Sequence, residues 1–455
     1  MRPLLALFLA LLVSSPAWAD SHAEDDGSEE GGDSSEGDAD EDEAPQEEGD
    51  SSEETEAAEP AADAPAEVES SEEPAAAGED APDTEDAPDA SAAPKFKGLP
   101  DRVVIDLPHD IQLIPVARVQ ARVTLFDQDD PERNDPIVYG DPGLREGVSL
   151  RRARFGIEAR WREMLSFRVV AGWDNRYDYT EAFSHNIRLT EAQFRLSPFD
   201  ALGVTVGLTR VPFGRQATAS SAHLALVERS LVSEHLSPDR EVGVFLSGSF
   251  GAQENPVVSD NAFRWAFGIS NGGGDWTGDA DPSPRLAGRV SLDLGAAWDQ
   301  AESGYELTGF GLSIGGSLAH NWGLEADSLS AGADLGIRFW RIGLQGEFMV
   351  SHAEPTFDTE GIPEQLAERT SMGGYGQLVF VILPGTLEVA ARVGVYDDNT
   401  GLSDAGDRLD AGGGVNLYLF DGRLKTQLNF IHREELNEAH QTANDSLILQ
   451  VQARL

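Results

Sequence analysis

The 455-residue chain contains no cysteine, and no long apolar run follows its first nineteen residues. Without cysteine it can form no disulfide framework, thiolate zinc site, cysteine nucleophile or cysteine-linked lipid anchor. Positive charge is scarce as well, because 33 Lys and Arg face 81 Asp and Glu, for a net charge of -48. A nucleic-acid-binding protein needs a basic face, so this balance argues against nucleic acid as a partner.

Residues 1–19 have the features of an export signal. Arg2 supplies a positive start, residues 4–13 are an unbroken apolar run, and residues 17–19 form a small-residue cleavage site. A transmembrane helix needs about 20 apolar residues, so this run is too short to span a bilayer. We expect a signal peptide and a mature protein that leaves the cytoplasm of a double-membraned bacterium.

Residues 20–94 have a different composition. They contain 31 Asp and Glu, no Lys or Arg, and no Phe, Trp or Tyr. Such a segment buries too little apolar surface to offset its ordering entropy, which predicts a disordered acidic tail. The tail is either a solvated spacer or an interaction segment for cations or basic periplasmic partners. Residues 95–455 then hold everything that can fold.

Period-two alternation of apolar and polar residues recurs through residues 95–455. In residues 148–162, Phe155, Ile157 and Trp161 share one face, while Arg154 and Glu158 share the other. This alternation is typical of strands with one apolar face. A soluble sandwich turns that face inward, whereas a membrane barrel turns it toward lipid and its polar face toward a wet lumen.

Sixteen segments fit this pattern, and most have the 9–12 residues that a tilted strand needs to cross a bilayer. An even number of strands suits a bacterial outer-membrane barrel with both ends in the periplasm. The predicted strands are 115–126, 148–162, 165–174, 187–197, 201–210, 241–250, 262–270, 285–294, 307–320, 330–340, 341–351, 371–382, 385–396, 408–419, 423–433 and 446–455.

The connections between these strands alternate between short and long. Residues 163–164, 383–384 and 420–422 are short, as periplasmic turns should be, and residues 127–147 and 211–240 are long, as external loops should be. Two turns on the short side, 251–261 and 295–306, are longer than the rule prefers. The sequence therefore predicts an all-β fold, a transmembrane antiparallel β-barrel of about 16 strands.

The predicted barrel wall is positive although the chain is acidic. The sixteen segments carry 22 basic and 9 acidic residues, and 28 of these 31 charges lie on the face opposite the apolar set. The three exceptions are Arg151, Arg188 and Arg210, which lie near strand ends where a long side chain can snorkel. A charge on the lipid face at mid-depth would cost about 2–4 kcal/mol, so the lumen is the expected place for the rest.

Arginines along such a lumen raise the local concentration of anions, and their planar guanidinium matches phosphate and carboxylate geometry. The alternative is that several of them pair with Glu158, Glu191, Asp334, Glu347 or Glu388 and only fill the wall. The candidates for the anion path are Arg118, Arg122, Arg152, Arg154, Arg160, Arg162, Arg168, Arg195, Arg264, Arg289, Arg338 and Arg392.

The loop 211–240 is the longest external connection and contains an apolar run at residues 224–227. A loop of that composition is expected to pack rather than to extend into solvent. It either folds into the barrel mouth and narrows the pore, or it is an ordinary packed surface loop. The candidate constriction residues in it are Arg215, Glu228, Arg229, Glu234 and Arg240.

Four segments resemble the phosphate-selective porin O and P family. They are RRARFGIEAR at 151–160, VGLTRVPFG at 206–214, VERSLVSEHLSPDREVGV at 227–244, and VNLYLFDGRLKTQLNFIH at 415–432 followed by the final strand ending SLILQVQARL. The resemblance runs from about residue 115 to the end and leaves the acidic tail uncovered.

The resemblance implies a sixteen-stranded outer-membrane porin, usually a homotrimer, that passes small anions such as phosphate by diffusion. In the family an arginine ladder lines the lumen, the third long loop constricts it, and lysines there help to select phosphate. This chain departs from that pattern, because its only lysines are Lys95, Lys97 and Lys425. Its last residue is Leu455, where such barrels usually end in an aromatic residue.

Two other functions compete with a channel. An enzyme is disfavoured, because the sequence has no HExxH pair and no GxSxG elbow, and no cofactor is implied. A non-conducting structural or binding barrel would use its acidic tail and loops to bind cations or partners, but sixteen strands favour a water-filled channel. The Asp-rich loops 127–135 and 397–407 suggest loosely held Ca²⁺, although solvated acidic loops are the preferred interpretation.

Overall fold

The computed structural model describes residues 103–126, 147–162, 164–174, 187–251, 261–273, 283–295, 302, 310–323, 326–357, 368–403, 406–437 and 445–455. All of them belong to the unit Asp89–Leu455. The predicted signal peptide, the acidic tail and the Asp-rich loop 127–135 lie outside the described residues. No helix among the described residues is long and apolar enough to cross a membrane.

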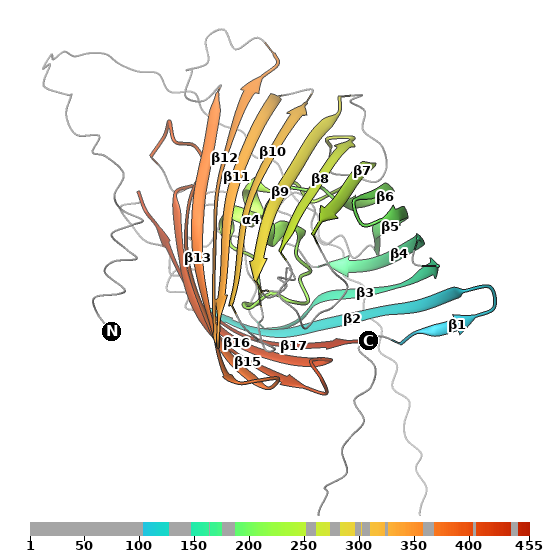
Figure 1. The fold of residues 1–455 in the computed structure, drawn as a ribbon. Helices are drawn as coiled ribbons and strands as arrows, with labels where there is room; N and C mark the ends of the chain where they lie inside the picture. The colour runs from blue at the N-terminus through green and yellow to red at the C-terminus, as the bar shows by residue number, and fades with distance from the viewer. Residues whose placement is uncertain are drawn as a thin grey trace, which may run out of the picture. The chain divides into compact units, whose positions relative to one another are not determined.

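Sixteen antiparallel strands form a closed barrel, in which each strand pairs with its neighbours in sequence and β17 closes on β2 (Figure 1). A short seventeenth strand, β1 (Ile105–Leu107), pairs only with the start of β2. The barrel strands are β2 (Ile111–Phe126), β3 (Gly147–Trp161), β4 (Leu165–Asp174), β5 (Arg188–Phe199), β6 (Leu202–Arg210), β7 (Arg240–Phe250), β8 (Ala262–Ser270), β9 (Arg285–Gly295), β10 (Phe310–Trp322), β11 (Ala326–Phe339), β12 (Ile342–Pro355), β13 (Arg369–Leu383), β14 (Leu387–Asp397), β15 (Arg408–Leu419), β16 (Leu424–Glu435) and β17 (Ser446–Arg454).

The barrel confirms the predicted fold class. Each of the sixteen predicted segments overlaps one barrel strand, with ends that shift by a few residues. The alternating pattern does not indicate the short strand β1. It also gives no sign of the two short helices α3 (Arg215–Thr218) and α4 (Leu231–Leu236), which lie in the connection between β6 and β7.

Side chains alternate between the two faces of the wall, as β17 illustrates. Leu447, Leu449 and Val451 are exposed on the outer face, while Gln450 and Gln452 are almost completely buried on the inner one. Apolar side chains therefore form the outer surface and polar ones line the interior, which is the arrangement of a barrel in lipid. The inner face is the place to look for a functional site.

The tight turns gather at the end of the barrel where the described chain begins and ends. The β11–β12 turn uses Trp340 at φ 55°, and the β15–β16 turn uses Phe420, Asp421 and Gly422, all with positive φ. Backbone conformations of this kind close short hairpins, here with two residues and with four residues between the strands. Strand direction then places the β6–β7 connection at the opposite end of the barrel.

Candidate channel and constriction site

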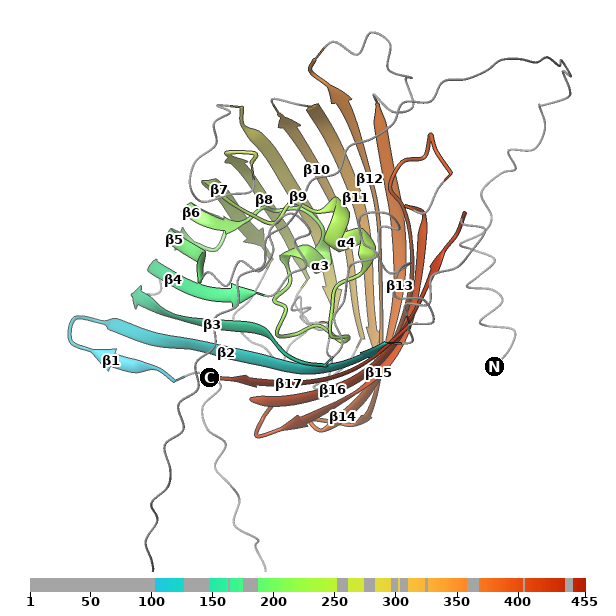
Figure 2. The ribbon, with the colours of Figure 1, turned by 180° about the vertical axis from the view of Figure 1, so that it is seen from behind.

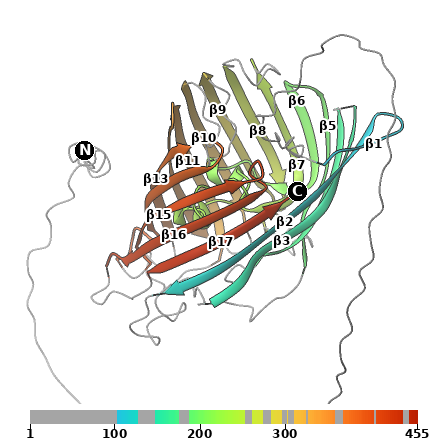
Figure 3. The ribbon, with the colours of Figure 1, turned by 90° about the horizontal axis from the view of Figure 1, so that it is seen from below.

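The connection between β6 and β7, residues 211–239, folds back inside the barrel. Both of its helices, α3 and α4, lie within the ring of strands in two opposite views (Figures 1 and 2), and the view from below shows the same segment enclosed by the wall (Figure 3). Phe213, Ala225 and Val232 have no exposed surface. The loop is therefore part of the lumen and not a surface loop.

Apolar contacts explain why the loop leaves solvent. Val211, Phe213 and Val232 pack with Met349 and Tyr375 of the inner wall. The run that the sequence singled out packs further along the wall: Leu226 joins a cluster with Val379 and Ala390, and Val227 joins one with Ile431 and Ile448. Inner-wall positions of a porin are usually polar, so these apolar wall residues mark where the loop docks.

Polar side chains of the wall bind the main chain of the loop. Lys425 Nζ donates to Leu224 O at 2.5 Å, and Asn416 Nδ2 donates to Ala225 O at 2.7 Å. Asn429 Oδ1 accepts from the Val227 amide at 2.7 Å. These bonds satisfy backbone groups that a segment without regular structure would otherwise bury unpaired. They fix the loop against β15 and β16.

The short helix α3 is bound at both ends. At its start, Glu347 of β12 accepts hydrogen bonds from the backbone amides of Arg215 and Gln216, the second at 2.9 Å. At its end, Arg210 donates to three carbonyls at residues 217–219, and Arg229 Nη2 donates to Ala219 O at 2.9 Å. An anion at the amide end and cations at the carbonyl end match the polarity of the helical turn. Burial lowers the pKa of the Arg215 guanidinium.

Glu228 is the centre of a cluster of arginines from β2 and β3. Its carboxylate accepts from Arg122 at 2.5 Å, from Arg151 at 2.6 Å and from Arg152 at 2.8 Å. Burial alone would raise the pKa of Glu228, but attraction to Arg151, Arg152 and Arg122 outweighs burial and holds that pKa well below its usual range. Glu228 thus remains ionised and anchors the loop to the basic wall.

Asp174, at the end of β4, is the second acid in this cluster. It pairs with Arg151, with Arg152 at 3.1 Å and with Arg154 at 3.3 Å. Arg152 therefore bridges Asp174 and Glu228. Two carboxylates shared among several guanidinium groups leave the cluster with excess positive charge.

Several guanidinium nitrogens beside this cluster have no acceptor. Nε of Arg118, Nε of Arg154, and Nε and Nη2 of Arg240 are buried and have no hydrogen-bond partner among the described residues. Arg240 Nη2 lies 3.6 Å from Glu191 Oε1, which is ion-pair distance but too long for a hydrogen bond. Arg118, Arg154 and Arg240 are also close enough to repel one another electrostatically. Unsatisfied buried donors next to like charges form a place where an anion would be stabilised.

The other predicted arginines divide into paired and exposed side chains. Arg168 pairs with Glu158 at 2.8 Å and with Glu191 at 2.5 Å, and Arg160 pairs with Glu158. Arg264 pairs with Asp293, Arg289 with Asp334, and Arg392 donates to the loop carbonyls at residues 228 and 229. Arg195 is exposed and donates to Ser197, and Arg338 is half-buried on β11. The alternative of wall-filling pairs thus applies to Arg160, Arg168 and Arg289.

Two predicted positions differ from the structure. Arg162 lies in the β3–β4 turn with φ 50°, where it pairs with Asp110 and is mostly exposed, so it is not part of the inner wall. The alternation that predicts an inward side chain ends with β3 at Trp161, one residue before Arg162. Arg240 is the first residue of β7 and not a loop residue. Glu234 lies in α4 and is exposed.

Arg151 and Arg210 face the lumen and not the lipid, which differs from the expectation based on strict alternation. A β-bulge explains Arg151: Gln120 pairs with Arg152 and Ala121 with Leu150, so Arg151 is an extra residue, and its side chain reaches the lumen. The position of Arg210 follows from Gly207, whose φ is 117°. Thr205 and Leu208 are both buried on either side of Gly207, so the alternation changes phase there and turns Arg210 inward. A phase change of this kind is invisible to a strict period-two count.

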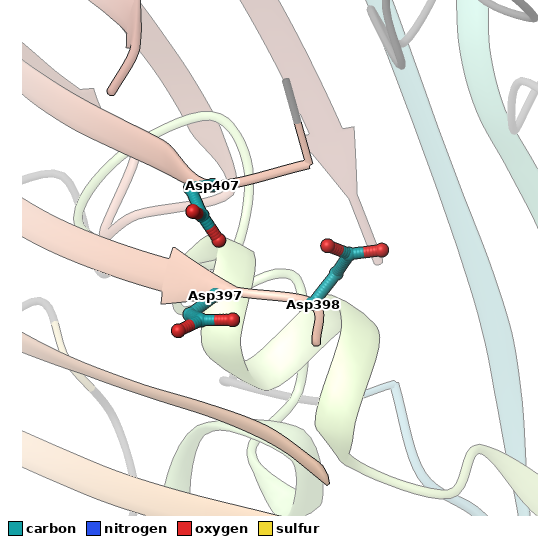
Figure 4. A group of neighbouring side chains, drawn as sticks. All are labelled: Asp397, Asp398 and Asp407. Atoms are coloured by element: carbon teal, nitrogen blue, oxygen red, sulfur yellow. The ribbon is translucent and has the colours of Figure 1, made fainter. Parts of the chain in front are cut away.

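Three carboxylates gather where β14 ends and β15 begins. Asp397, Asp398 and Asp407 can bring one oxygen each within 4.8 Å of the others (Figure 4). Arg369 pairs with Asp398 at 2.8 Å, and the Asn437 amide donates to Asp407. These partners agree with the preferred interpretation of residues 397–407 as an acidic loop, so we assign no ion to the group.

Solved structures with a similar fold are porins. The OmpF porin of Salmonella typhi, solved in complex with daunomycin, aligns over 78% of this chain and 100% of its own, with 9% identity and a TM-score of 0.50. An anion-selective porin from Comamonas acidovorans aligns over 76% of this chain and 100% of its own, with 12% identity and a TM-score of 0.48. At these identities the likeness concerns the fold alone.

OmpT of Vibrio cholerae in its trimer form aligns over 76% of this chain and 99% of its own, with 7% identity and a TM-score of 0.46. No curated protein sequence matches the chain. The family model described as phosphate-selective porin O and P matches residues 128–455. That match covers most of the chain and includes fifteen of the sixteen barrel strands completely. The chain therefore belongs to the phosphate-selective porin O and P family of bacterial outer-membrane proteins, which form channels for small solutes.

Proposed function

We propose that this porin passes small anions by diffusion, and that oxyanions such as phosphate bind transiently on the way. The observation that carries the proposal is the set of buried, acceptor-free nitrogens on Arg118, Arg154 and Arg240. Planar guanidinium groups that converge on one place fit the oxygens of phosphate or a carboxylate. In a narrow passage of low dielectric constant the same groups enrich chloride as well.

The constriction follows from the loop that fills part of the lumen. Residues 211–239 dock on the wall from β10 to β17, and their Glu228 meets the arginines of β2 and β3. The barrel face formed by β4–β9 carries Arg168, Arg195 and Arg264, so solute would move between this face and the loop. Arg215 and Arg229 lie on α3 and beside it, where they stabilise the loop.

Assembly and orientation form the next part of the proposal. We propose a homotrimer in the outer membrane, which family membership and the trimeric form of the Vibrio cholerae porin support. We also place the N-terminal segment in the periplasm, because the described chain begins at the end of the barrel that carries the tight turns. Light scattering of the purified protein tests the trimer, and protease protection in intact cells tests the orientation.

Block of chloride current by inorganic phosphate tests the proposed solute. Single channels in KCl should lose current when millimolar phosphate is added, and the Arg118→Gln and Arg240→Gln variants should need several times more phosphate for the same block. Equal block in both variants and the wild type would remove these arginines from the site. A barrel that inserts into the bilayer without conducting would favour the alternative of a structural or binding barrel.

A further inference from the structure

Two connections from opposite ends of the barrel meet inside it. The β6–β7 loop enters from one end, and the connection between β9 and β10 starts from the other, because three strand reversals separate β6 from β9. Of residues 296–309 in that second connection, the structure describes Glu302 alone, and its backbone amide donates to His223 O of the loop at 3.1 Å. This contact joins the loop to a part of the chain that begins at the far rim.

The Glu302 side chain makes three more hydrogen bonds. Its Oε1 accepts from Gln216 Nε2 at 2.7 Å, and its Oε2 accepts from the Ala225 amide at 3.0 Å. Oε2 also accepts from Gln377 Nε2 of β13 at 3.0 Å. One buried carboxylate therefore binds the start of the loop, the middle of the loop and the barrel wall at the same time.

The chemistry of this site favours a positioning role. Glu302 forms no ion pair with a described Lys or Arg, so amide groups supply its hydrogen bonds and Lys425 adds only longer-range attraction. A buried carboxylate without a cation is expensive unless its hydrogen bonds are complete, and removing it would leave three donors unsatisfied. A negative charge also contributes nothing favourable to a passing anion. Holding a segment in place accounts for all four contacts.

We propose that Glu302 is a positioning residue that holds the 211–239 loop against β13–β16 and so keeps the pore at one open width. The other wall contacts each bind one stretch of the loop, whereas the Glu302 carboxylate joins residues 216 and 225 to each other and to β13. When these contacts are lost, the remaining contacts hold residues 216–225 less firmly, and this stretch moves into the lumen more often. The proposal rests on the chain being a channel, but not on its preference for anions.

Single-channel recordings of Glu302→Ala and Glu302→Gln test this role. We expect Glu302→Ala to enter partly closed levels at least about tenfold more often than the wild type, since about 1.4 kcal/mol corresponds to tenfold in a population. Glu302→Gln keeps one carbonyl oxygen, so its frequency of partly closed levels should lie between those of the wild type and Glu302→Ala. Glu354→Gln removes an exposed carboxylate at the end of β12 and serves as the matched control with unchanged recordings.

A reversible cross-link gives a second readout that a general loss of stability would not produce. Because the chain has no cysteine, the pair His223→Cys with Glu302→Cys creates the only possible disulfide. The oxidised protein should carry the steady single-channel current of the wild type. Reduction in the bilayer should then cause transitions to partly closed current levels. His223→Cys alone should respond to neither treatment.

Two results would overturn the proposal. One is a Glu302→Ala channel whose current level and noise equal those of the wild type, and the other is a cross-linked cysteine pair whose reduction leaves the current unchanged. If Glu302→Ala fails to fold, the cross-linked pair and Glu302→Gln still decide the question. A wild-type barrel without any conductance would instead contradict the channel itself, so the two failures are distinguishable.

Discussion

Arg152 and Glu228 lie 76 positions apart in the sequence and form an ion pair inside the barrel, with 2.8 Å between Nη2 and Oε2. Arg152 belongs to the wall, and Glu228 belongs to the loop that enters from the rim. The pair therefore links the basic wall to the element that narrows the lumen. Arg122 and Arg151 share the same carboxylate, so the link is a network and not an isolated bridge.

Removing the charge of Glu228 should loosen this link. Glu228→Gln leaves three guanidinium groups with a neutral acceptor, and we expect the loss of about 2 kcal/mol of unfolding free energy. The change is measured as a shift in the thermal midpoint of the barrel, which is read from its gel mobility after heating to a series of temperatures. Glu354→Gln removes an exposed carboxylate at the end of β12, away from this cluster, and should leave that midpoint unchanged.

The depressed pKa of Glu228 predicts how this contribution depends on pH. A carboxyl group with a folded pKa below its unfolded value of about 4.3 stabilises the fold above that value and loses its effect as pH falls toward the folded pKa. The difference in thermal midpoint between the wild type and Glu228→Gln should be constant from neutral pH to about pH 5 and shrink below about pH 4. A difference that shrinks near pH 6 would contradict the assignment.

The three arginines that carry acceptor-free nitrogens, Arg118, Arg154 and Arg240, should control ion preference. Arg154→Gln combined with Arg240→Gln removes two of the three guanidinium groups at the proposed anion site, so the ratio of chloride to potassium permeability should fall several-fold. Arg162→Gln removes one positive charge from the exposed β3–β4 turn and should have little effect. Equal changes from the lumen and turn variants would indicate a general effect of net charge instead of a site.

Gly207 should be intolerant of any side chain. Its φ is 117°, and a Cβ there would lie 2.1 Å from Ala192 O. Gly207→Ala is therefore expected to lower the unfolding free energy of the barrel by about 1–3 kcal/mol. At Gly316 the nearest atom to a Cβ is Gly332 O at 3.8 Å, so Gly316→Ala should fold with a wild-type thermal midpoint.

The strands were predictable because alternation over nine or more residues is a local signal. Most barrel strands have it, and the outer face of β17, with Leu447, Leu449 and Val451, shows it clearly. The bulge at Arg151 and the phase change at Gly207 are not local in this sense, because each depends on how a strand meets its neighbour. Strict alternation therefore assigned Arg151 and Arg210 to the wrong face.

The site was less predictable than the wall. The apolar run at residues 224–227 indicated a packed loop, but nothing in the sequence says that Lys425 binds Leu224 O or that Glu302 binds the Ala225 amide. Such contacts join segments that lie far apart in the chain. The one sequence feature that points to Glu302 is the length of the connection 295–306, which exceeds that of a tight periplasmic turn.

The reversal potential of the purified protein in a planar bilayer under a KCl gradient tests the central claim most directly. The proposed function predicts a potential with the sign of a chloride-preferring channel, and a smaller current at every voltage after phosphate is added. A potential with the sign of a potassium-preferring channel would contradict it, because the acidic loops and not the lumen arginines would then control permeation.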